Sequence, residues 1–346
     1  MGTICKIADI DIYLLYFLKI KTIFVLSAIT KDENELISKQ DFFREIQLLR
    51  QKHEINKYKI IDLASRYSFI SILDWMDESV CNFIYSSSAI YYAAENGHIE
   101  VLEWFANSKR RGRAYEFKYT TRAIDIAAEY GHINILDWFA NSKYEFIYTD
   151  NAIDYAAENG QIDVLDWFAN SKNRGQPYEF KYTTRAINNT TYNGHINVLE
   201  WFDNSKYEFK YTDYAINCAA LKGHINVLEW FANSKRRGRP YEFKYTYKTI
   251  NYAAYGGHIN ILDWFANSKY EFKYTYKAIN YAAKNGYINI LEWFAKSKYE
   301  FKYSAQAIDY AAYYGHINVL KWFNKTHYEF KYSRYAIDNA LFLHNL

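Results

Sequence analysis

One pattern of apolar and polar positions recurs along most of the chain. It reads Ala-Ile, an acidic or amide residue, Tyr-Ala-Ala, two variable residues, Gly-His-Ile, one further residue, Val or Ile, Leu, an acidic residue and Trp-Phe. In the copy that contains residues 99–106, apolar residues surround most of a helical wheel and leave a polar stripe at Glu100, Glu103 and Asn107. A helix this apolar must be covered on several sides. The pattern therefore predicts helices sandwiched between neighbouring copies.

A first helix is predicted before each of these second helices. Residues 122–129 are an example, and their adjacent Ala127 and Ala128 allow another helix to approach closely. Thr120 or Thr121 is placed to cap the start of this helix. Gly131 follows its end and supplies the positive φ that a tight turn between two helices needs. The unit is therefore helix, turn, helix, and the fold class is all-α.

Nine copies can be counted by their turn position. The spacing alternates between 29 and 34 residues and then settles at 29, and every Trp falls seven residues after a turn position. The turn positions are Ser68, Gly97, Gly131, Gly160, Gly194, Gly223, Gly257, Gly286 and Gly315. The longer spacing comes from five extra residues, 110–114, 173–177 and 236–240, which we expect to lie outside the folding unit.

The copies divide the chain into three parts. Residues 59–335 form nine repeats of 29 or 34 residues, residues 336–346 are a truncated C-terminal capping repeat, and residues 1–58 form an N-terminal cap that can hold a degenerate repeat. Residues 12–29 are almost long and apolar enough to span a membrane. Lys19 and Lys21 stand at the middle of that segment, where each would cost about 2.5–3.5 kcal/mol. The segment favours a cap, with a membrane segment as the alternative.

A short aromatic connector links successive units. Residues 115–119 read Tyr-Glu-Phe-Lys-Tyr, so that three aromatic side chains alternate with two charged ones. This period of two predicts an extended segment whose aromatic side packs on the helices.

Composition narrows the class of protein. The formal net charge of +3 is too small to indicate a nucleic-acid or membrane partner by itself. Three cysteines, Cys5, Cys81 and Cys218, are odd in number and lack metal-ligand or redox spacing. A reducing, cytoplasmic compartment, of the cell or of an infected host cell, fits this usage.

The repeat resembles the ankyrin repeat. The resemblance is carried in each copy by Ala-Ile, Ala-Ala and Gly-His-Ile with a following Ile-Leu, as in Ala123, Ile124, Gly131, His132 and Leu136. This resemblance implies an ankyrin-like repeat solenoid that binds other proteins. The repeat is also similar to the short, aromatic-rich ankyrin repeats of large DNA viruses of amoebae. The Thr-Pro pair of the family is absent, and Asp125, Asp154 or Asn188 replaces the following His.

The sequence contains no phosphate-binding loop, no nucleophile elbow, no paired Cys-x-x-Cys and no calcium loop, which predicts a protein that is not an enzyme and has no cofactor, no metal and no small-molecule substrate. One His per layer cannot chelate a metal, because stacked helices lie about 10 Å apart and zinc–nitrogen bonds are about 2 Å. We expect these His side chains to form hydrogen bonds at the start of the second helix. The recurring acids, such as Glu103, Asp137 and Asp263, are interpreted as a solvated stripe.

Positions that differ between copies are the candidates for partner recognition. They are the two residues before the turn Gly and the residue that opens the first helix, and the resemblance places them on the binding face. Tyr, Arg and Asn among them are residue types that carry interface energy. The candidates are Arg122, Glu129, Tyr130, Asn151, Glu158, Asn159, Arg185, Tyr192, Tyr214, Lys222, Lys248, Tyr255, Lys277, Lys284, Tyr313 and Tyr314.

The five-residue insertions offer an alternative site. Their basic residues recur in every second repeat and, with the Lys of each connector, could bind nucleic acid or an acidic partner. These residues are Arg110, Arg111, Arg113, Arg174, Arg236, Arg237 and Arg239. The primary prediction is a scaffold for an unidentified protein partner.

Overall fold

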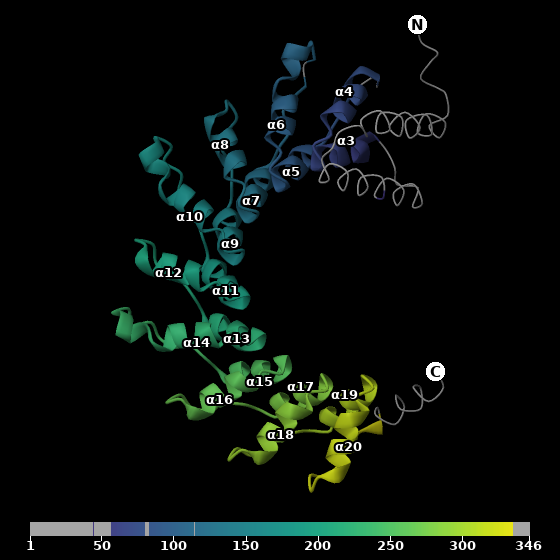
Figure 1. Ribbon diagram of the computed structural model, residues 1–346, viewed down its shortest axis with the longest axis vertical. Coiled ribbons are helices and arrows are strands. Elements are labelled where there is room, and N and C mark those ends of the chain that lie inside the picture. The colour runs from purple at the N-terminus through teal and green to yellow at the C-terminus, as the bar shows by residue number, and fades with distance from the viewer. Residues whose placement is uncertain (1–43, 45–56, 80–82, 114, 335–346) are drawn as a thin grey trace, which may run out of the picture. The chain divides into compact units, whose positions relative to one another are not determined.

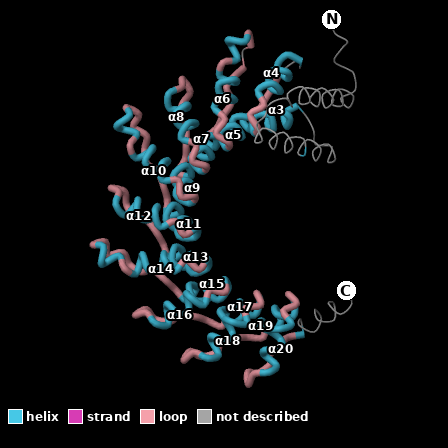
Figure 2. Tube along the Cα trace, in the orientation of Figure 1, coloured by secondary structure: helices cyan, strands magenta, loops and turns pink. Residues whose placement is uncertain are grey.

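The computed structural model describes residues 44, 57–79, 83–113 and 115–334. These residues form helices and loops and contain no strand (Figures 1 and 2). Among them no helix is long and apolar enough to cross a membrane. Residues 12–29, the final segment 336–346 and most of the predicted N-terminal cap lie outside the described residues.

The helices come in pairs that have the predicted helix-turn-helix order. The pairs are α3 (Lys57–Arg66) with α4 (Ile70–Ser79), α5 (Ser87–Glu95) with α6 (Ile99–Ala106), α7 (Thr121–Glu129) with α8 (Ile133–Asn141), α9 (Asn151–Glu158) with α10 (Ile162–Ala169), α11 (Thr184–Asn193) with α12 (Ile196–Asn204), α13 (Asp213–Lys222) with α14 (Ile225–Ala232), α15 (Tyr247–Gly256) with α16 (Ile259–Asn267), α17 (Lys277–Lys284) with α18 (Ile288–Lys296), and α19 (Gln306–Tyr313) with α20 (Ile317–Lys325). The insertions add the short 3₁₀ helices η1 (Ser108–Arg111), η2 (Ser171–Arg174) and η3 (Ser234–Arg237).

Two compact units make up the chain. Unit 1 comprises Met1–Ala152 and Asp166–Glu179, and unit 2 comprises Ile153–Leu165 and Phe180–Leu346. In unit 1, α5 packs between α3 and α7, and in unit 2 the first helices α11, α13, α15, α17 and α19 pack side by side in sequence. This is an ankyrin-like stack of helix pairs, as the sequence predicted.

First helices pack more closely than second helices. In unit 2, Ala253 and Ala254 are completely buried, because their short side chains let the neighbouring first helices approach. The second helices bury a Phe in each copy, such as Phe265, and Figure 1 shows their far ends spreading apart. The core of each unit is therefore a row of small residues beside a row of large ones.

Each turn Gly has the predicted positive φ, and most of them have a second reason to be Gly, because a ring of the next repeat lies against the turn. At Gly223 φ is 78°, and a Cβ built there would lie 2.6 Å from Nδ1 of His258 in the next repeat. In unit 1 a Cβ at Gly97 would lie 2.8 Å from Nδ1 of His132. The His ring thus covers the preceding turn.

The same His ring binds the preceding repeat. Nε2 of His132 lies 2.9 Å from the backbone oxygen of Glu95. Nε2 of His258 lies 3.0 Å from the backbone oxygen of Leu221. A carbonyl oxygen only accepts, so Nε2 donates. No side-chain cap bond is found at His132 or His258. The His at the start of the second helix therefore forms a structural hydrogen bond, as expected, but its acceptor lies in the preceding repeat rather than in the helix.

In several first helices an internal acidic or amide residue links the helix to the next repeat. Buried Asp154 accepts from the backbone N–H of Thr183 at 2.8 Å and from its hydroxyl at 2.6 Å. Asn251 and Thr275 form the amide version of this link. Thr183 also caps α11, whereas Thr120 makes no side-chain cap bond. The residues that replace the family's His thus form a link of their own.

The connectors pack their aromatic side chains on the helices, as predicted, but they are not fully extended, because the backbone N–H of Lys244 donates to the oxygen of Glu242 inside the connector at 3.0 Å. Phe243 stacks on Tyr270 with ring centroids 4.3 Å apart and packs on Trp264. The hydroxyl of Tyr245 donates to the backbone oxygen of Glu271 in the next connector at 3.1 Å. Neighbouring connectors are therefore joined by one Tyr hydrogen bond.

Candidate partner-binding surface

Five of the candidate residues lie together on a groove in unit 2. The groove lies where the first helices end and turn into the second helices, and its volume is about 700 Å³. We call it the turn surface and define it by Tyr192, Lys222, Tyr255, Lys284 and Tyr314. Successive first helices supply these residues because the two positions before each turn Gly face the same side of the stack.

Lysine and tyrosine side chains alternate along the turn surface. Nζ of Lys222 lies 4.4 Å from the ring centroid of Tyr192, and Nζ of Lys284 lies 5.4 Å from that of Tyr314. Both distances are in the range of cation–π attraction, which holds the ammonium groups against the rings. The two lysines are thus positioned by their neighbours while Lys222 stays exposed.

The floor of the groove is neutral. His258 and Tyr287 line it, and no Asp or Glu is among the described residues that do so. Burial lowers the pKa of His258, with the hydrogen bond to the oxygen of Leu221 acting in the opposite direction. Lys222 and Lys284 therefore supply positive charge to a groove without a carboxylate in its lining.

Exposed aromatic side chains extend beyond the groove. Tyr313 stands edge-on to Tyr314 with centroids 4.8 Å apart, and both side chains are about half exposed (48% and 49%). Tyr255 packs edge-on against Tyr281 at 5.4 Å. Large aromatic surfaces left in water are rare on a single folded chain unless they bind something.

Residues that open the first helices lie away from the groove. Lys248 and Lys277 are exposed. Arg185 lies over the ring of Tyr155, with 5.2 Å from Cζ to the centroid. Tyr214 hydrogen-bonds to Cys218, which together with burial raises the pKa of Tyr214 to about 12.

In unit 1 the turn positions are more acidic. Tyr130 is exposed, Glu129 is half-buried, and Arg122 lies over the ring of Tyr91 at 5.2 Å. Asn151, half-buried, donates its backbone N–H to the Thr149 hydroxyl. None of these four residues lines the groove of unit 2.

Two further candidates, Glu158 and Asn159, belong to unit 2. Glu158 accepts from the amide of Asn189 at 2.8 Å, and the amide of Asn159 donates to the backbone oxygen of Tyr155 at 3.0 Å. Both side chains are partly used within the fold.

The basic insertions mostly serve the fold. The guanidinium groups of Arg111, Arg174 and Arg237 lie 3.9, 4.3 and 4.0 Å from the ring centroids of the Trp residues in their own repeats. Each also donates to the backbone oxygen of that Trp. The expectation that the insertions lie outside the folding unit is therefore wrong, because their arginines cover its Trp.

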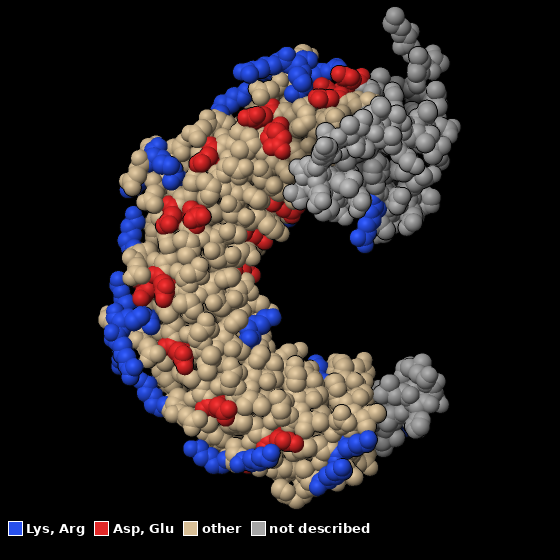
Figure 3. Space-filling model, viewed as in Figure 1, with Lys and Arg blue, Asp and Glu red and all other residues tan. Residues whose placement is uncertain are grey.

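Buried carboxylates hold two more insertion arginines. Asp77 lies 3.3 Å from Arg113, and Asp203 lies 3.8 Å from Arg239. Arg110 and Arg236 are exposed. Figure 3 shows Lys and Arg gathered along the loops after the second helices, with Asp and Glu beside them. The basic insertions are therefore partly neutralised by carboxylates of the same chain.

Connector lysines are likewise used inside the chain. Nζ of Lys273 lies 3.2 Å from a carboxylate oxygen of Glu271 and 5.4 Å from the ring centroid of Tyr245. Lys302 pairs in the same way with Glu300 at 3.4 Å. Such pairs leave less free positive charge for a nucleic acid.

Part of the acidic stripe binds tryptophan. Asp137 accepts from the indole N–H of Trp167 at 2.7 Å, and Asp263 accepts from that of Trp293 at 2.6 Å. Their interpretation as merely solvated is wrong, since each joins two repeats. Among the described residues no group of three His, Cys, Asp or Glu could hold a metal ion.

The comparison with protein families identifies one matching stretch. Residues 124–169 match the family described as ankyrin repeats (many copies). This stretch contains most of α7 and all of α8, α9 and α10. No curated protein matches the chain. The ankyrin-like fold therefore rests on this stretch together with the repeated helix pairs.

Proposed function

We propose that this chain is a non-catalytic scaffold whose protein partner binds the turn surface of unit 2. Ankyrin repeats are in general protein–protein interaction modules. The observation that carries the proposal is the groove itself, in which Tyr192, Tyr255 and Tyr314 stand beside Lys222 and Lys284. Tyr side chains offer a large rigid contact area at a small cost in conformational entropy.

The chemistry of the groove indicates what its partner presents. Two lysines and no acidic lining favour a segment with backbone carbonyls or carboxylates near aromatic or aliphatic side chains. The cations are already held by Tyr rings, so little side-chain entropy is lost when they bind. The resemblance to repeats of large DNA viruses makes a cytoplasmic host-cell protein the partner class to test first.

A pull-down with matched variants tests the proposal. The turn variant combines Lys222→Ser, Tyr255→Ser and Lys284→Ser. A control variant combines Lys296→Ser, Lys321→Ser and Ile317→Ser, which removes two lysines and one exposed apolar side chain from second helices of the same unit. Both variants should keep the helical circular dichroism of the wild type, because these positions are not part of the core.

The outcome is read from capture before and after nuclease. We expect proteins captured from host-cell lysate to survive nuclease, to persist with the control variant and to be lost with the turn variant. Capture that depends on nucleic acid and disappears at high salt would instead favour the basic loops. Equal capture by both variants would contradict the turn surface.

A further inference from the structure

Tryptophans of the repeats fall into two classes. In repeats with an insertion, Trp104, Trp167 and Trp230 are only 6–7% exposed. In repeats without one, Trp138 and Trp264 are half-buried. The aromatic surroundings are the same, since Trp230 lies 6.0 Å from Tyr241 and Trp264 lies 5.8 Å from Tyr270, both stacked. The insertion is therefore what covers the indole.

An arginine of the insertion is the covering group. In unit 1 Arg174 stacks over Trp167 at 4.3 Å and donates to its backbone oxygen at 2.6 Å. In unit 2 Arg237 occupies the same place over Trp230. Within the described part of the chain, no Lys or Arg lies over the rings of Trp138 or Trp264.

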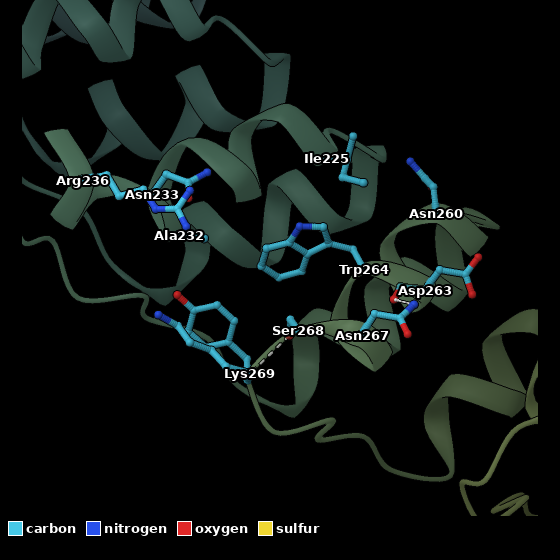
Figure 4. Close-up of a pocket in the computed structure, with 11 residues that line it drawn as sticks. Ile225, Ala232, Asn233, Arg236, Asn260, Asp263, Trp264, Asn267, Ser268 and Lys269 are labelled. Carbon is cyan, nitrogen blue, oxygen red and sulfur yellow. Dashed lines mark hydrogen bonds between the residues drawn. The ribbon is translucent and has the colours of Figure 1, made fainter.

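Trp138 and Trp264 each line a groove of about 700 Å³. Figure 4 shows the groove of unit 2, with the Trp264 indole standing between the side chains of α14 and those of α16. The α14 side provides Ile225, Ala232 and Asn233, and the α16 side provides Asn260, Asp263 and Asn267. In unit 1 the groove of Trp138 repeats this composition with Ile99, Ala106, Asn107, Asn134, Asp137 and Asn141.

The polar groups of the groove are only partly used. Asn267 donates one amide hydrogen to the backbone oxygen of Asp263 at 2.9 Å, and Asn141 does the same toward Asp137. These bonds orient the amides and leave their oxygens as acceptors. Along the described residues, the indole N–H of Trp138 and Trp264 has no protein acceptor.

We propose that the grooves of Trp138 and Trp264 each bind an arginine side chain of a partner protein. The chain itself supplies the precedent, because its own arginines fill the equivalent place in the repeats with insertions. A guanidinium stacks on an indole face through its plane, while its edge donates to carbonyl and amide oxygens. A lysine ammonium cannot do both.

Charge makes the two grooves unequal. Asp137 and Asp263 occupy equivalent places in the two grooves, but Glu103 also lines the groove of Trp138, whereas Arg236 lines that of Trp264. One lysine lines each groove: Lys143 in that of Trp138 and Lys269 in that of Trp264. Their Nζ atoms lie 5.3 and 5.4 Å from the ring centroids of Tyr144 and Tyr270. The Trp138 groove therefore binds a cation more tightly than the Trp264 groove.

Nuclear magnetic resonance of the full chain tests this proposal. The nine indole N–H signals are assigned with single Trp→Phe variants, and acetyl-Gly-Arg-Gly-amide or its Lys counterpart is titrated in. We expect the Trp138 signal to shift first and the Trp264 signal next, with the Lys peptide at least about fivefold weaker. The signals of Trp104, Trp167 and Trp230 should not move.

A gain-of-binding variant provides the second measurement. Arg174→Ser removes the internal guanidinium from Trp167 and should make the Trp167 signal respond to the Arg peptide. The neighbouring exposed Lys172→Ser serves as the control and should leave that signal silent. Equal shifts with Arg and Lys peptides, or no shift at Trp138 at millimolar peptide, would overturn the proposal.

Discussion

A Cβ atom added to Gly223 would lie 2.6 Å from Nδ1 of His258, although the two residues belong to successive repeats. The turn of one copy is thus closed by the ring of the next copy. Gly238 in η3's loop has nearly the same φ, 77° against 78°, but nothing lies within 4 Å of its Cβ position. The two glycines separate backbone strain from packing.

Substituting these two glycines by Ala should lower the free energy of unfolding by different amounts. Gly238→Ala should lower the free energy of unfolding by about 1–2 kcal/mol through left-handed strain alone. Gly223→Ala should cost a further ~1–3 kcal/mol, because the ring of His258 must move. Urea unfolding of both variants checks this. Equal losses would show that the ring is not held in place.

Two adjacent arginines test whether the insertion is structural. Arg237→Ala should lower the free energy of unfolding by about 1–3 kcal/mol, because it removes the stack on Trp230 and a partner of buried Asp203. Arg236→Ala, at an exposed position, should change it by less than about 0.5 kcal/mol. Thermal unfolding followed by circular dichroism compares the two variants. An unchanged melting temperature for Arg237→Ala would mean that the insertion does lie outside the folding unit.

Trp167→Ala should be the most destabilising single change in unit 1 among those considered. The side chain is 6% exposed, stacks with Phe146 and Tyr178, and donates to Asp137. A loss of about 3–5 kcal/mol is expected, concentrated in the neighbouring repeats. Hydrogen exchange should show faster exchange around this Trp; unchanged exchange and melting would refute the packing.

Stability should fall in mild acid because of three half-buried histidines. Burial lowers the pKa values of His98, His195 and His258 in the folded chain. The unfolded chain, with a His pKa of about 6.5, therefore takes up these protons first as the pH falls. The stability that these neutral histidines contribute is therefore present above about pH 6.5 and is lost as the pH falls below that value.

The pH effect can be assigned to one ring. His258→Tyr, which copies the Tyr287 found at this position in the next repeat, should reduce the drop in melting temperature between pH 7.5 and pH 5.5. The same drop in the variant and in the wild type would mean that His258 does not contribute.

Much of the fold could be predicted from the sequence, since the periodic Ala, Trp and Gly positions determine the helix pairs. The links between repeats could not. Asp154 reaching Thr183, or Asp137 reaching Trp167, joins residues about one repeat apart, and a pattern within one copy does not show such pairs. The covering arginines lie in the same copy as their Trp, as Arg174 does with Trp167, and they were missed because the insertions have no counterpart in the other copies. Grouping of the turn residues into one groove depends on how successive first helices stack.

Photo-cross-linking tests the proposed scaffold most directly. A photoreactive phenylalanine analogue replaces Tyr255 in one protein and Ile317 in another, and each is irradiated in host-cell lysate after nuclease treatment. The account predicts a discrete protein adduct from position 255 that is absent from position 317 and is competed by unlabelled wild-type chain. Adducts from both positions alike, or none from position 255, would contradict it.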